Sequence, residues 1–116
     1  MSDHPITIEP VPGRVSVRFN GAVVVDTDKA LVMHESIYPP VYYLPLSDTV
    51  TDALKPSDHS THCPHKGDAS YFTLSVDGSE AENAVWIYRE PKDGVAQIRD
   101  HIAFYPKYVQ IEVAGG

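Results

Sequence analysis

Prolines and glycines interrupt this sequence so often that only short regular elements fit between them. The chain has ten prolines and seven glycines in 116 residues. Proline ends helices and removes a backbone donor from sheets. Several of the intervals alternate apolar and polar residues, which is the period of a strand with one buried face. The sequence therefore predicts a mainly β fold of short antiparallel strands, formed as a single domain over residues 1–116.

Two tight turns predict hairpins. Asn20-Gly21 supplies the two positive φ angles of a type I′ turn and joins the preceding strand to a partner over residues 22–27. Asp77-Gly78-Ser79 joins strands expected over residues 69–76 and 81–88, which are rich in aromatic and β-branched residues. We expect this second pair to lie at the centre of the sheet.

Five further elements complete the prediction. A strand over 30–35 continues an opening meander, and the prolines of 37–45 confine that segment to an edge or rim. A short helical turn is expected around 48–54. Apolar residues at helical spacing predict one amphipathic helix over 95–102, near the C-terminus, and a closing strand follows over 108–113.

Charge and cysteine content exclude several classes of function. Nine Lys and Arg against 16 Asp and Glu give a formal net charge of −7, and no basic run is present, so nucleic acid is not expected as a partner. The single cysteine, Cys63, cannot form an internal disulfide, and residues 1–5 lack the pattern of a signal peptide. A cytoplasmic location is therefore expected. No apolar run approaches the ~20 residues of a membrane-spanning helix.

Reactive side chains gather over residues 57–68, which we expect to form a loop. The segment holds three histidines, a thiol, an ammonium group and two carboxylates. His59, His62 and His65 could converge on a metal together with Cys63. The alternative is a set of exposed polar side chains. Because zinc sites usually draw ligands from two separated pairs, and no second pair follows, no metal is predicted.

Cys63 and Lys66 are the candidate catalytic residues. Cationic neighbours favour the thiolate and would make Cys63 a nucleophile or redox thiol, whereas a cysteine that only packs is the alternative. Lys66, beside Gly67, could hold a phosphate or carboxylate group, and its alternative is a solvated surface lysine.

Aromatic side chains form the second cluster with functional potential. Aromatic walls with a few convergent polar groups are typical of small-molecule sites, and Trp86 is the expected anchor, against the alternative of pure core packing. The groove is predicted to have walls formed by Tyr38, Tyr43, Trp86 and Tyr105, with polar groups supplied by His59, Thr61, Cys63 and Lys66.

These features predict a binding domain for a small, flat and in part anionic molecule. The first alternative is an enzyme that uses Cys63, and the second is a protein-interaction module, which would show an exposed apolar patch. The cofactor, the ligand and the oligomeric state stay open.

Four motifs lie between residues 38 and 105. They are Tyr38-Pro39-Pro40-Val41-Tyr42-Tyr43-Leu44-Pro45, Thr61-x-Cys63-Pro64-x-Lys66-Gly67, Glu82-Asn83-Ala84-x-Trp86-x-Tyr88 and Ala103-Phe104-Tyr105. Together they resemble a bacterial and fungal family of domains of unknown function, the one numbered four hundred and twenty-seven. The resemblance implies a β-tent, or Mss4-like, fold in which sheets lean together over a groove.

Relatives of that fold hold zinc through paired Cys-x-x-Cys knuckles, which this chain lacks. The family also carries a nucleotidyltransferase-like label. The sequence shows no Gly-Ser helix start followed by an Asp-x-Asp pair, which that chemistry would use to bind magnesium and a triphosphate.

Overall fold

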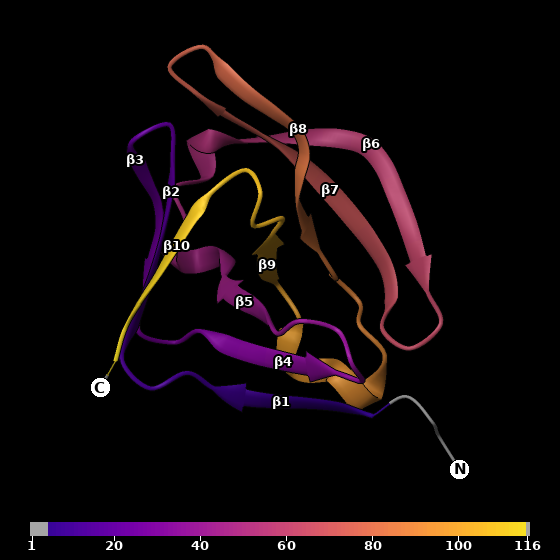
Figure 1. Ribbon diagram of the computed structural model, residues 1–116. Coiled ribbons are helices and arrows are strands. Elements are labelled where there is room, and N and C mark those ends of the chain that lie inside the picture. Colours follow the sequence, from indigo (N-terminus) through magenta and orange to yellow (C-terminus); the bar gives the residue numbers. More distant parts are fainter. Residues whose placement is uncertain (1–4, 116) are drawn as a thin grey trace.

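The alternating segments form two antiparallel sheets in the computed structural model, which describes residues 5–115 (Figure 1). The strands are β1 (Ile6–Pro10), β2 (Arg14–Phe19), β3 (Ala22–Thr27), β4 (Leu31–Glu35), β5 (Val41–Pro45), β6 (Leu54–Cys63), β7 (Gly67–Val76), β8 (Ser79–Ile87), β9 (His101–Phe104) and β10 (Gln110–Ala114). The larger sheet has the order β1-β4-β5-β9-β8-β7-β6, and the smaller has the order β10-β2-β3. The mainly β prediction is confirmed.

Both predicted hairpins are confirmed by their turns. Asn20 and Gly21 have φ angles of 52° and 81° between β2 and β3, and Asp77 and Gly78 have φ angles of 49° and 83° between β7 and β8. In each hairpin both central residues thus lie in the left-handed region that a type I′ turn requires. β7 and β8 both lie inside the larger sheet, as expected.

The predicted amphipathic helix over 95–102 is wrong. The segment forms a 3₁₀ helix, η3 (Asp93–Ile98), which is interrupted by a kink at Val95, and the chain then enters β9. Val95, Ile98 and Ile102 are all buried, so the apolar spacing did mark core positions. Asp100, however, has a φ of 58°, which ends any helix before Ile102. Ile102 reaches the core from a strand between β5 and β8.

The edge position predicted for residues 37–45 is also wrong. β5 lies between β4 and β9, inside the larger sheet. Pro39 and Pro40 precede this strand and Pro45 is its last residue, so none of them removes a donor from its middle. β4 confirms a strand near 30–35, but it pairs with β1 and β5 and does not continue the β2–β3 meander.

Two short 3₁₀ helices occupy the region where one helical turn is predicted. They are η1 (Leu46–Asp48) and η2 (Thr51–Ala53). Residues 1–4, which carry most of the signal-peptide prediction, lie outside the described residues. Over residues 5–115, no helix has the length and apolar character needed to cross a membrane.

The core has two layers, one on each face of the larger sheet. Strand alternation sends Leu44, Ile87 and Ile102, which are cross-strand neighbours, toward the smaller sheet. They pack there with Val15, Val17, Val24, Val25 and other residues of one continuous cluster. The opposite face carries a second cluster, partly covered by η3, whose buried members are Met33, Tyr43, Ala69, Tyr71, Tyr88, Val95, Ile98 and Ala103.

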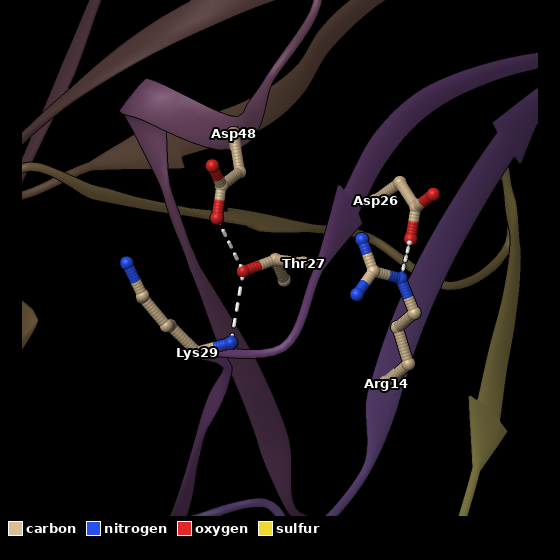
Figure 2. Close-up of polar contacts among 5 residues, drawn as sticks. All are labelled: Arg14, Asp26, Thr27, Lys29 and Asp48. Atoms are coloured by element: carbon tan, nitrogen blue, oxygen red, sulfur yellow. Dashed lines mark hydrogen bonds and ion pairs between the residues drawn. The ribbon is translucent and has the colours of Figure 1, made fainter.

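A buried hydroxyl fastens the smaller sheet to η1 (Leu46–Asp48), which directly follows β5 of the larger sheet (Figure 2). Thr27, at the end of β3, is 1% exposed; its Oγ1 donates to Asp48 Oδ2 at 2.7 Å and accepts from the Lys29 backbone N–H at 3.0 Å. A buried hydroxyl without partners would cost about 1–3 kcal/mol. The nearby pair of Arg14 Nε and Asp26 Oδ1 is more than half exposed and contributes little.

Candidate functional site

The reactive segment over 57–68 is most of a hairpin, and the expectation of a loop is wrong. Residues up to Cys63 belong to β6, and β7 begins at Gly67. β6 is an edge strand of the larger sheet (Figure 1). An edge strand exposed on both faces carries polar residues without alternation, and this explains why its sequence is typical of a loop.

The hairpin sends its histidines in different directions. The His59 ring lies against Tyr71, with 4.5 Å between ring centroids. His62 Nδ1 lies 2.7 Å from Asp68 Oδ1, in a cross-strand pair between the exposed parts of β6 and β7. His65 lies in the turn between the strands. Within residues 5–115, no three or more His, Cys, Asp or Glu side chains form a group that could hold a metal ion.

Two bulges face each other across β7. Pro56 and Ser60 of β6 pair with Phe72 and Ser70 of β7. Residues 57–59 of β6 therefore lie opposite one residue of β7, which makes two extra residues on β6. β8 likewise carries two more residues than β7 over 82–84. The Ser57 hydroxyl donates to Asn83 Oδ1 and so connects the bulges across the intervening strand. Bulges of this kind re-aim side chains and are frequent next to active sites.

Four aromatic side chains, Tyr43, Trp86, Tyr105 and Tyr71, form what we call the aromatic row. Trp86 pairs with Tyr71 and with Ala103 in the neighbouring strands, so these residues share one face of the larger sheet. The Trp86 ring lies 6.5 Å from that of Tyr43 at 84°, and 4.7 Å from that of Tyr105 at 50°. These are favourable edge-to-face and tilted arrangements.

Hydrogen bonds fix the row. Trp86 Nε1 donates to the Tyr43 hydroxyl at 3.2 Å, and the Thr61 and Tyr71 hydroxyls lie 3.0 Å apart. Burial raises the pKa of Tyr43 to about 12, and burial together with a hydrogen bond to Tyr71 raises the pKa of Tyr105 to about 12. A tyrosine is protonated at neutral pH even at its ordinary pKa of about 10, and these shifts keep both phenols protonated to higher pH, so each hydroxyl can donate as well as accept.

The row borders a hollow of about 220 Å³, which we call the polar cavity. Its lining residues are His59, Tyr71, Glu82, Asn83, Tyr105, Lys107 and Tyr108. The two bulges thus supply His59, Glu82 and Asn83 to it. Trp86 lines a separate apolar hollow of about 270 Å³, with Tyr42, Phe104, Ile111 and others.

Cys63 and Lys66 lie near the tip of the hairpin, apart from the polar cavity lining. Cys63 is a half-buried free thiol. The Lys66 ammonium pairs with a carboxylate oxygen of Glu35 from β4, and the two side chains are only 13% and 16% exposed. Burial raises the pKa of the Tyr88 phenol, with smaller electrostatic contributions from Tyr43 and Cys63.

The described structure thus divides the predicted site residues into groups. His59, Thr61 and Tyr105 meet around Tyr71, and Tyr43 and Trp86 extend the row behind them.

Cys63 and Lys66 lie together near the hairpin tip, where the Lys66 backbone N–H donates to the Cys63 carbonyl. Tyr38 lies in the turn between β4 and β5 and is 61% exposed.

Comparison with known sequences assigns the family. A family model described as a domain of unknown function (DUF427) matches residues 7–115. The chain belongs to this family. The match confirms the resemblance carried by the sequence motifs. No curated protein matches the chain significantly.

The sequence of this DUF427 domain marks three lining residues of the polar cavity to different degrees: Tyr71, Lys107 and Tyr108. Tyr71 stands in a clear β pattern and could be placed on a face by alternation alone. Lys107 and Tyr108 follow Pro106 in an irregular segment between β9 and β10. No local pattern marks them, because only the fold brings that segment beside the two bulges.

Proposed function

We propose that this DUF427 domain binds a small molecule whose flat part rests on Tyr105, beside Tyr71, in the polar cavity. The observation that carries the proposal is the aromatic row, fixed by hydrogen bonds and bordered by a cavity that two bulges furnish. Aromatic surface with a few convergent polar groups is the usual composition of such sites. A β-tent arrangement of the two sheets, as the family resemblance implies, would suit a groove there.

The size of the cavity limits the ligand. Its volume of about 220 Å³ is below the ~300–1,000 Å³ of sites for drug-sized ligands. The ligand is therefore of the size of one ring with a few substituents. Tyr105 is 38% exposed and is accessible from solvent, whereas Tyr43 is 1% exposed and supports the row from behind.

The lining also determines the polarity of the ligand. The Asn83 amide is oriented by Ser57, and the Tyr105 hydroxyl is protonated at neutral pH. Lys107 and Glu82 bring one charge of each sign. The ligand therefore carries hydrogen-bonding groups around its ring, because an apolar ring would leave these groups unpaired on binding.

Thiol chemistry at Cys63 is the second candidate. It is favoured by the half-buried position of the free thiol in the same hairpin turn as Lys66. It is weakened by the pairing of Lys66 with Glu35, because that ammonium is engaged by a carboxylate. We therefore place binding first.

A thermal-shift screen of nucleotides, sugars and thiol metabolites tests the proposal. We expect at least one single-ring polar compound to raise the melting temperature of the protein. Tyr105→Ala should weaken its binding roughly two- to tenfold, because it removes ring contact worth roughly 0.5–1.5 kcal/mol. Tyr38→Ala, which truncates another exposed tyrosine outside the cavity lining, should leave binding unchanged. Equal losses in both variants would contradict the assignment.

A further inference from the structure

A second hollow adjoins the polar cavity. It has a volume of about 450 Å³, and its lining residues are Arg18, Asn20, Gly21, Lys107, Tyr108, Val109 and Gln110. Lys107 and Tyr108 line both hollows, so the two meet along that segment. We call the second hollow the basic cavity.

The charge of the basic cavity is opposite to that of the chain. The whole sequence has a net charge of −7, yet this lining contains two cations, Arg18 and Lys107, and no carboxylate. Arg18 Nε lies 3.4 Å from Glu112 Oε1, a long contact between side chains that are 43% and 66% exposed. Such a pair is weak, and it involves one of the five N–H donors of the guanidinium group.

Neighbouring residues hold Lys107 and the β2–β3 turn in place. Lys107 Nζ lies 5.0 Å from the centre of the Tyr108 ring, a cation–π distance. Asn20 Nδ2 donates to the Val76 carbonyl at 3.2 Å and so ties the β2–β3 turn to the end of β7. A Cβ on Gly21 would meet nothing within 4 Å, so the backbone of the turn borders open space.

The geometry points to an oxyanion subsite. We propose that the basic cavity binds a phosphate or carboxylate group of the same ligand whose ring lies in the polar cavity. Arg18 supplies a planar set of donors that matches an oxyanion, and Lys107 supplies a point charge where the two cavities meet. The ring half of this inference rests on the proposed function. The ligand class is then a single-ring compound with an oxyanion arm.

Titration of the ¹⁵N-labelled protein with inorganic phosphate, and separately with acetate, tests the subsite. At low ionic strength, we expect saturable shifts of the amide signals of residues 18–22 and 107–110, and the tighter of the two anions identifies the preferred oxyanion. Arg18→Gln and Lys107→Gln should each weaken binding roughly three- to tenfold. Added salt should weaken it as well.

Lys29→Gln is the matched control, because it removes the same charge at the other end of β3 from Gly21. The control should bind both anions as the unaltered protein does. Absence of saturable shifts, or equal binding by all variants, would overturn the subsite.

Phenol and phenyl phosphate separate this inference from the proposed function. If phenyl phosphate binds more tightly than phenol and Arg18→Gln removes the difference, both proposals are supported. If phenol binds and phenyl phosphate binds no better, the subsite is overturned while the ring site stands. If inorganic phosphate binds at residues 18–22 and no ring compound reaches Tyr71 or Tyr105, the subsite stands and the proposed function fails.

Discussion

Lys66→Met should lower the free energy of unfolding by about 3–5 kcal/mol. The Lys66 ammonium pairs with Glu35, and both side chains are mostly buried, at 13% and 16% exposed. Removing the cation takes one favourable charge interaction away from a carboxylate in a poorly hydrated position, which is the costly part of breaking such a pair. Urea denaturation of the variant measures this loss.

Lys55→Met is the matched control for that variant. Lys55 Nζ lies 2.6 Å from Glu80 Oε2, but these side chains are 60% and 49% exposed, so the control should cost less than about 1 kcal/mol. The double variant Glu35→Gln, Lys66→Met should recover most of the loss, because both members of the pair are then uncharged. If Lys66→Met lowers the free energy of unfolding no more than Lys55→Met does, the pair of Lys66 and Glu35 does not stabilise the fold. Lys66 would then be available to bind a ligand or to act on Cys63.

Gly67→Ala should lower the free energy of unfolding by about 2–4 kcal/mol. Gly67 begins β7 with a φ of 115°, which side chains rarely adopt, and an added Cβ would lie 3.3 Å from the Glu90 carbonyl oxygen. That oxygen belongs to backbone held close to the hairpin, since the Lys92 N–H donates to the Lys66 carbonyl at 3.0 Å. Neither partner can move away cheaply.

Gly78→Ala separates backbone strain from crowding. Gly78 also has a positive φ, 83°, but a Cβ there would meet nothing within 4 Å. It should therefore show only the conformational cost of about 1 kcal/mol. Equal losses at the two glycines, measured by the same denaturation experiment, would mean that contact with Glu90 does not hold the hairpin tip.

Local signals account for the parts of the fold that the sequence predicts. Asn20-Gly21 and Asp77-Gly78 dictate their turns through backbone conformation alone, so both hairpins follow from a few residues. The predictions that are wrong concern apolar residues that are buried, but in a backbone conformation that their spacing does not specify. The apolar spacing from Val95 to Ile102 resembles that of a helix, but its last member is buried from a strand instead.

The residues of the candidate site likewise divide into those that the local sequence predicts and those that only the fold brings together. Three rings of the aromatic row, Tyr43, Trp86 and Tyr105, are in the predicted lining, because large aromatics in β-rich segments gather on a face. Arg18 and Lys107 are not, since β2 and the segment before β10 meet only in the folded chain. The bulges that aim His59 and Asn83 depend likewise on register across three strands.

The side chain of Trp86 provides the most direct test of ligand binding at the aromatic row. Trp86 is the single tryptophan of the chain, so its indole N–H gives one resolved signal in a ¹H–¹⁵N spectrum. That N–H donates to Tyr43, and its ring packs on Tyr105, which borders the polar cavity. Titration with single-ring polar compounds should move this signal saturably, together with the amide signals of Tyr71 and Tyr105. An indole signal that no such compound moves would show that the row serves core packing alone.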